Sequence, residues 1–144
     1  MLSSYTERII GRLREEGLKV TPQRIAIIKH LDGNTVHPAV DDIYREVSRD
    51  FPTLSLATVY NTLDTLERIG EVRAICADPN RKHYDPNTSL HHHAICSRCN
   101  AIRDVTADYS TALKLPAEVA EVFAVEEAFA YFRGVCEGCS SLAA

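Results

Sequence analysis

Between Ser55 and Gly70 the chain reads SLATVYNTLDTLERIG. Apolar residues recur there every three or four positions, at Leu56, Val59, Leu63 and Leu66, and this spacing predicts a helix with one buried face. Ser55 is a suitable residue to cap the start of the helix, and Gly70 is suited to end it. The opposite face carries small polar groups and one aromatic ring, at Thr58, Tyr60, Asn61, Asp64 and Thr65.

Shorter helices are predicted upstream of this segment. One spans about 4–16, with Ile9, Ile10 and Leu13 on one face and Gly17 at its end, and one opens at Thr21-Pro22 and stops near Gly33, with Ile25, Ile28 and Leu31 inward. A third begins near Pro38 and buries Val40, Ile43, Tyr44 and Val47. Downstream, 71–77 and 82–85 are predicted strands, joined by a turn at Asp78-Pro79-Asn80. This order is typical of a winged helix-turn-helix, which places its longer helix in the major groove of DNA.

The second half of the chain alternates strands with one helix. Strands are predicted at 94–96, 101–106 and 122–133, and a helix at about 110–120. Residues 1–84 carry 12 basic and 12 acidic residues, whereas 85–144 carry 4 basic and 8 acidic ones. We therefore expect an α+β protein with a DNA-binding domain at 1–84 and a second, α/β domain at 85–144. The net charge of −4 argues mildly against nucleic acid, so any basic surface must be local.

Length and composition fit an ordinary globular protein. The chain has 144 residues, of which 45% are hydrophobic and 25% charged. It has no apolar run of the roughly 20 residues that cross a membrane, and its first residues lack the apolar core of a secretory signal. These features predict a cytoplasmic protein without a membrane partner, whose thiols stay reduced.

Two CxxC pairs, Cys96–Cys99 and Cys136–Cys139, are separated by 36 residues. Two such turns brought together supply the four sulfurs that structural zinc prefers, and they leave no coordination position for a substrate. A redox pair or disulfides are the alternatives, but thioredoxin-like motifs come singly near a βαβ pattern, and reducing compartments disfavour disulfides. Cys76 is expected to be an ordinary thiol on the wing.

A second metal site is indicated by His91-His92-His93, just before the first pair. On a strand His91 and His93 point to the same side and His92 to the other. Nearby Asp85 and Asp104 are candidates to complete the site, and His37 would link it to the DNA-reading half. Such an N/O set suits Fe²⁺, Mn²⁺ or zinc. Taken singly, His37 is as easily a residue at a helix start, the two aspartates as easily surface carboxylates, and His30 and His83 surface or packing residues.

Together these motifs resemble the ferric uptake regulator family over essentially the whole chain. The likeness rests on GLKVTPQR at 17–24, HPAVDDIY at 37–44, ATVYNTL at 57–63, HHHAICSRC at 91–99 and GVCEGC at 134–139. The resemblance implies a homodimer with winged-helix domains and a C-terminal dimerisation domain. It also implies that His37, Asp85, His91, His93 and Asp104 together hold a regulatory Fe²⁺ or Mn²⁺.

Within the family the sequence is most similar to the peroxide-responsive repressors, which use three histidines and two aspartates at these positions. The likeness implies that peroxide oxidises His37 or His91 and releases the operator. Leu90, Thr111 and Ala128 stand where some members carry ligands of a third site, so two metals per chain are expected. A regulator of iron or zinc supply is the alternative within the family.

We expect double-stranded DNA, as a palindromic A·T-rich operator, to be contacted by Lys19, Arg24, Thr58, Tyr60 and Asn61. Exposed Asp64 would weaken binding if it lies near a phosphate. A zinc-ribbon enzyme and a winged-helix protein adaptor are the competing classes. We do not expect an enzyme, because the sequence offers no catalytic acid or base.

Overall fold

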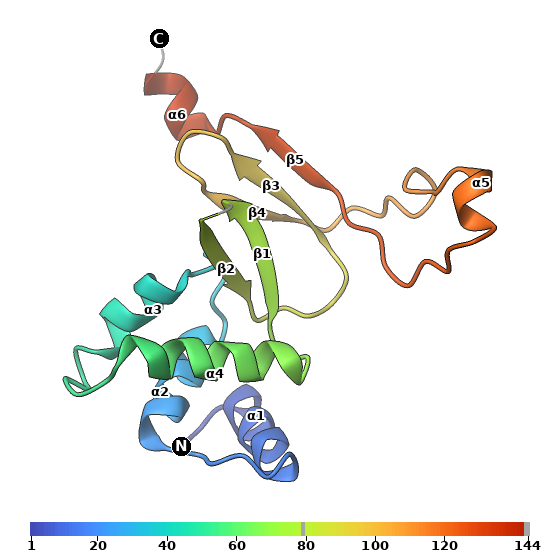
Figure 1. The fold of residues 1–144 in the computed structure, drawn as a ribbon. Helices are drawn as coiled ribbons and strands as arrows, with labels where there is room; N and C mark the ends of the chain where they lie inside the picture. Colours follow the sequence, from blue (N-terminus) through green and yellow to red (C-terminus); the bar gives the residue numbers. More distant parts are fainter. Residues whose placement is uncertain (79, 143–144) are drawn as a thin grey trace. The chain divides into compact units, whose positions relative to one another are not determined.

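The computed structural model describes residues 1–78 and 80–142, and contacts divide the chain into the units Met1–Thr88 and Ser89–Ala144 (Figure 1). The first unit contains the helices α1 (Ser4–Glu15), α2 (Pro22–Leu31), α3 (Val40–Val47) and α4 (Leu56–Arg68), followed by strands β1 (Arg73–Asp78) and β2 (Arg81–Asp85). This is the predicted order of a winged helix-turn-helix. The domain boundary that we expect after residue 84 stays a prediction.

Hydroxyl caps begin three of the four helices in the first unit. Ser3, Thr21 and Ser55 each accept a hydrogen bond from the backbone N–H three residues on, at Thr6, Arg24 and Thr58. Each bond satisfies one of the N–H groups that a helix start leaves without an intrahelical partner. Short-range sequence signals therefore set the starts of α1, α2 and α4.

One hydrophobic core fills the first unit. Its members come from all four helices and the hairpin, and include Ile9, Leu13, Ile28, Leu31, Ile43, Leu63, Leu66, Val72 and Tyr84. Two residues that we expected inside lie elsewhere: Leu56 is 44% exposed, and Ile27 replaces Ile25 as a buried residue of α2. Leu56 is the first residue of α4, where no preceding turn covers its side chain.

The wing is an antiparallel hairpin whose register pairs Arg73 with Asp85 and Ile75 with His83. Pro79, in the expected turn, lies outside the described residues. Ala39 forms an isolated antiparallel bridge with His83, and the N–H of Tyr84 donates to the carbonyl of Pro38 at 2.9 Å. The segment that enters α3 is thus held against β2.

The second unit is built on a three-stranded sheet in the order β4-β3-β5, formed by β3 (His92–Cys96), β4 (Ile102–Val105) and β5 (Tyr131–Gly134). Strand β3 pairs antiparallel with β4 and parallel with β5, and α6 (Glu137–Leu142) follows β5. The mixed helix and strand content is as predicted for this half.

Two element predictions in this unit are too long. The helix expected at 110–120 is only α5 (Ala117–Ala120), and the strand expected at 122–133 is reduced to β5. No residue from 103 to 141 is buried, so this stretch has little in its own unit to pack against. A short helix needs such packing to persist, and Pro116 also limits how far upstream α5 can begin.

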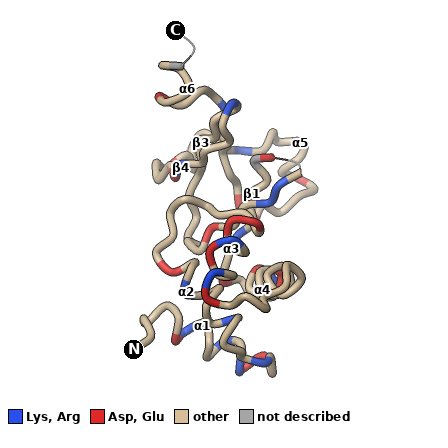
Figure 2. Tube along the Cα trace, turned by 90° about the vertical axis from the view of Figure 1, so that its left-hand side faces the viewer, with Lys and Arg blue, Asp and Glu red and all other residues tan. Residues whose placement is uncertain are grey.

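Charged residues of both signs alternate along the first unit and form no single basic block (Figure 2). Arg8 and Arg12 of α1 both pair with buried Glu71, the latter at 3.9 Å.

None of the helices in the described part of the chain is long and apolar enough to cross a membrane.

The cap of α4 gives the first testable prediction. Ser55→Ala removes the acceptor for the N–H of Thr58 and should lower the free energy of unfolding by about 1 kcal/mol. Ser55→Asp should recover most of this loss, because aspartate caps as well as serine does. Chemical denaturation would measure both variants. Equal stability of Ser55→Ala and the wild type would show that the cap contributes nothing to α4.

Candidate metal centres and nucleic-acid interface

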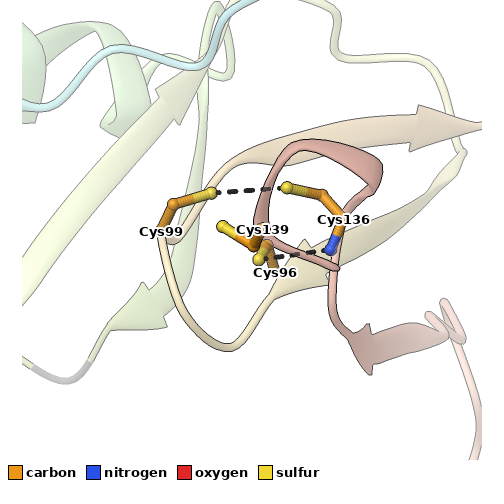
Figure 3. Close-up of side chains that lie close together, drawn as sticks. All are labelled: Cys96, Cys99, Cys136 and Cys139. Carbon is orange, nitrogen blue, oxygen red and sulfur yellow. Dashed lines mark hydrogen bonds between the residues drawn. The ribbon is translucent and has the colours of Figure 1, made fainter. Parts of the chain in front are cut away.

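The four CxxC cysteines lie together in the second unit (Figure 3). Cys96 ends β3, and Cys99 follows it in the turn. Cys136 directly precedes α6, and Cys139 lies in the first turn of that helix. Their sulfur atoms all lie within 4.8 Å of one another, and Cys99 Sγ is 3.7 Å from Cys136 Sγ. Zinc bound to four thiolates at 2.3 Å would space the sulfurs about 3.8 Å apart. The geometry therefore fits a tetrahedral S₄ zinc site, and all five cysteines are free thiols.

Backbone N–H groups prepare one of these thiols to ionise. Hydrogen bonds from the backbone of Cys136, Cys99 and Arg98 lower the pKa of Cys96 to about 5. Hydrogen bonds with the thiols of Cys136 and Cys99 raise the pKa of Cys139 to about 12. The four thiols thus ionise unevenly, because hydrogen bonds favour the thiolate at Cys96 and the neutral thiol at Cys139, and charge on a neighbouring sulfur adds to the second effect. A divalent cation removes the repulsion between charged sulfurs and allows all four to bind as thiolates.

A second donor cluster in the same unit is formed by His91, His93 and Asp104. Asp104 Oδ1 lies 3.0 Å from His91 Nε2 and 3.3 Å from His93 Nε2. The Nδ1 of His91 lies 2.7 Å from the carbonyl of Ser89, which can only accept, so Nδ1 carries a proton and Nε2 is the ring nitrogen that faces Asp104. A second proton on the ring, or a metal ion bound by both atoms, would hold an imidazole nitrogen and a carboxylate oxygen at this distance. Octahedral ligands at about 2.1 Å from a metal would lie about 3.0 Å apart.

The first unit supplies a further pair of ligand type. His37 Nε2 lies 3.3 Å from Asp85 Oδ2, and both side chains are buried. His37 has a φ of 55°, one of two non-glycine residues with positive φ in the described chain. A non-glycine residue in this left-handed region costs on the order of 1–3 kcal/mol and persists only where its surroundings hold it. Such outliers concentrate at functional sites, which favours a ligand role over that of a plain helix start.

The start of α3, directly after His37, is anchored by charged groups. Asp42 Oδ2 accepts the N–H of Ala39 at 3.0 Å, and Asp42 Oδ1 accepts from Arg81 at 2.9 Å. Arg81 also donates two hydrogen bonds to Asp41, and these raise the pKa of Arg81 and lower that of Asp41. Arg81 on the wing is therefore already engaged within the protein.

The expected DNA-contacting residues lie on or near α2 and α4. Tyr60 is 48% exposed, Asn61 is exposed and Thr58 half-buried on α4, while Lys19 is exposed before α2. Arg24 donates to the backbone carbonyl of Lys19 at 2.5 Å, so part of its hydrogen-bonding capacity orders this loop. Asp64 is exposed on α4, and Glu67 of the same helix pairs with Lys82 of the wing at 2.7 Å.

Some contributors to these sites carried no sequence signal. His83, expected at the surface or in packing, is buried and contacts the His37 carbonyl at 2.7 Å. His92 turns away from its neighbours, as the strand alternation predicts, and its Nδ1 accepts the N–H of Ala130 at 3.0 Å. It therefore links β3 to the chain just before β5. The Ser89 carbonyl that orients His91 is a backbone group, which residue patterns cannot reveal.

Comparison with known proteins places these sites in context. The profile of the ferric uptake regulator family matches residues 15–131. The peroxide-responsive repressor PerR of Staphylococcus aureus strain Mu50 is 35% identical over 133 residues, covering 92% of this chain and 90% of that protein.

Solved structures agree with the sequence match. PerR from Streptococcus pyogenes, whose structure was solved to explain peroxide sensing and gene regulation, is 32% identical to this chain. The match has a TM-score of 0.54 and covers 96% of this chain and 95% of that one. The ferric uptake regulator Fur of Helicobacter pylori shares the fold at 21% identity, with a TM-score of 0.77 over 95% of this chain and 92% of its own. The profile match and the sequence identity over most of both chains show that this chain belongs to the ferric uptake regulator family, whose members are metal-dependent transcriptional repressors and not enzymes.

Proposed function

We propose that this chain is a metal-dependent repressor that senses peroxide through Fe²⁺ or Mn²⁺ held by His37, Asp85, His91, His93 and Asp104. The observation that carries the proposal is the single Asp104 oxygen set against the Nε2 atoms of both His91 and His93. Oxygen and imidazole donors without thiolate suit these two ions. The 35% identity to a peroxide-responsive repressor supports the same conclusion.

The switch follows from how the ligands are distributed along the chain. His37 and Asp85 belong to the unit with the reading helix, whereas His91, His93 and Asp104 belong to the other unit. An ion bound by both sets would restrain the first unit and favour the conformation that fits DNA. A coupling of about 3 kcal/mol would change DNA affinity about 150-fold.

A dimer with two reading helices is supported by the surface of the second unit. Val122 is 83% exposed and Phe123 64% exposed, and this unit buries few apolar residues of its own. Apolar exposure of this extent marks an interaction surface. We propose that a second copy covers it, because regulators of the family bind DNA as dimers. Two reading helices about 34–36 Å apart would then meet a palindromic, A·T-rich operator in successive major grooves.

Peroxide sensing assigns separate tasks to the residues of the site. Ferrous iron, when bound, would reduce hydrogen peroxide next to the imidazoles and lead to the addition of one oxygen atom to His37 or His91. His91 is aimed at that position by the Ser89 carbonyl. Loss of either imidazole would weaken the site and release the operator, so the event is a self-inactivation.

We place this repressor in the cytoplasm, where bacterial DNA lies.

A regulator of iron or manganese supply with the same architecture is the second candidate. The presence of His37 with Asp85, and of Asp104 between two histidines, fits metal sensing as well as peroxide sensing. Oxidation of histidine separates the two functions.

Removal of the cysteine site tests the structural role of zinc. Cys99→Ser or Cys136→Ser should lose zinc and with it the folded dimer, because the metal contributes to folding itself. Zinc content by elemental analysis and oligomeric state by sedimentation would measure this, with Cys76→Ser as the matched control that keeps both. A folded dimer without zinc at these cysteines would refute the structural role.

The reading helix is tested at Tyr60. Tyr60→Ala should lower specific DNA affinity by about 1–3 kcal/mol, because an exposed ring that can pack on a thymine methyl is lost. Tyr60→Phe should retain most of the affinity, and metal content should stay unchanged in both variants. Footprinting with the metal-loaded dimer measures the effect, and an unchanged footprint for Tyr60→Ala would remove this residue from the interface.

The sensing reaction is tested at Asp104 and His37. Asp104→Glu reaches one methylene further and should keep metal-dependent DNA binding while it suppresses histidine oxidation. His37→Ala should weaken metal-activated DNA binding, because it removes a ligand from the DNA-reading unit. Mass spectrometry of Fe²⁺-loaded protein after mild peroxide would detect the added oxygen on a histidine peptide, with Mn²⁺-loaded protein as the control. No histidine oxidation in the wild type would leave the metal-supply regulator as the function.

A further inference from the structure

The backbone at His37 needs an external support. Its φ of 55° lies in the left-handed region, and Pro38 follows it. A non-glycine residue rarely adopts this region, and the ring of Pro38 further restricts the backbone of the residue before it. The conformation of His37 is therefore unfavourable in itself. The side chain of His37 is also buried, at 1% exposure, so its Nε2 position depends directly on this backbone.

Strand β2 supplies the support through one side chain. The ring of His83 places Nδ1 2.7 Å from the His37 carbonyl, and because a carbonyl only accepts, Nδ1 is the protonated nitrogen. The backbone of His83 also pairs with Ala39, two residues beyond His37. His83 therefore fixes the segment on both sides of Pro38.

The surroundings of His83 show no competing task for the ring. His83 is 7% exposed, and in the described part of the chain its Nε2 has no hydrogen-bond partner. Its cross-strand neighbour on β1 is apolar Ile75. Among the described residues, the one polar contact of the side chain is thus the backbone carbonyl of a proposed ligand.

We infer that His83 is a positioning residue for the regulatory metal, which holds His37 in its left-handed conformation through the Nδ1–H bond to the His37 carbonyl. This inference rests on the proposed role of His37 as a ligand. It adds a residue outside the five ligands to the set that determines metal affinity. Its consequence is that metal binding is sensitive to a side chain that never touches the ion.

Substitutions at His83 separate positioning from simple packing. His83→Phe keeps a ring but removes the donor, and it should weaken Mn²⁺ binding by about 10- to 100-fold. His83→Asn places an amide N–H close to the position of Nδ1 and should restore most of the affinity. Ile75→Val is the matched control, because it loosens the packing beside His83 without removing the bond, and its Mn²⁺ affinity should equal that of the wild type.

The measurements use the full-length, zinc-loaded dimer. Mn²⁺ titration gives the affinities, and ¹⁵N NMR of the His83 ring before Mn²⁺ is added should show the proton on Nδ1. The NMR test needs no variant, so it applies even if His83→Phe fails to fold. A proton on Nε2, or His83→Phe affinity equal to that of the wild type, would overturn the inference.

Two further outcomes keep the inference separate from the proposed function. If His83→Asn binds Mn²⁺ as weakly as His83→Phe, then Nε2 is the functional atom and positioning through Nδ1 is wrong. If His37→Ala binds Mn²⁺ as well as the wild type, then His37 is not a ligand and both the proposed site and this inference fail. If His37→Ala is weak and His83→Phe is not, only the inference fails.

Discussion

The pairing between residues 37–39 and strand β2 constrains the metal-binding part of the first unit. Ala39 bridges to His83, the Tyr84 N–H donates to the Pro38 carbonyl, and Asp85 at the end of the strand reaches the ring of His37. Side chains alternate along a strand, so Arg81, His83 and Asp85 share a side. Arg81 contacts the first turn of α3, and His83 and Asp85 contact His37 before it. Lys82 and Tyr84 share the other side and reach α4 and the core. One short strand thus carries one proposed ligand, Asp85, and the side chain that contacts another, His37.

The second unit depends on contributions from outside its own sheet. It places Ile95, Cys96 and Ile102 among the buried residues, whereas most apolar side chains beyond Ile102 are exposed. Burial of apolar surface is the main favourable term in folding, and so small a core supplies little of it. Zinc at the four cysteines would tie α6 to the end of β3, and a second copy would cover the exposed residues. We therefore expect zinc binding and dimer formation to be parts of folding in this unit.

Local signals predicted the first unit well, because its elements are set within a few residues. Ser55 and Thr21 cap the helices as expected, and the apolar spacing located most of the core. The same reasoning failed at 110–133, where periodicity suggested long elements but little in the unit covers their apolar faces. A single sequence does not show which surface a partner covers, so it also does not show which apolar pattern becomes regular structure.

The residues of the candidate sites likewise fall into those that local sequence signals predicted and those that only the fold reveals. The spacing of the two CxxC pairs predicted a four-cysteine metal site. Strand alternation predicted that His91 and His93 act together while His92 faces away. The role of His83 was not visible, because it depends on the left-handed backbone of a residue 46 positions earlier. Long-range pairing of this kind appears in no local pattern. Residue types therefore indicate which ions a site prefers, and only the fold shows which side chains hold the ligands in place.

The free energies of the contacts between β2 and the rest of the first unit indicate how metal binding would affect the reading helix α4. The direct link from β2 to α4 on the outer side is the Lys82–Glu67 ion pair, and both side chains are more than a third exposed. Exposed pairs of this kind contribute about 0–1 kcal/mol, which is at or below the low end of the roughly 1–3 kcal/mol of a typical allosteric coupling. Tyr84 of the hairpin and Val72 just before it, by contrast, are buried in one core with α1–α4. A well-packed core resists gradual deformation, so the first unit responds as one body. An ion held by His37 and Asp85 would accordingly act on DNA binding by orienting that whole unit, and not by bending the wing against α4.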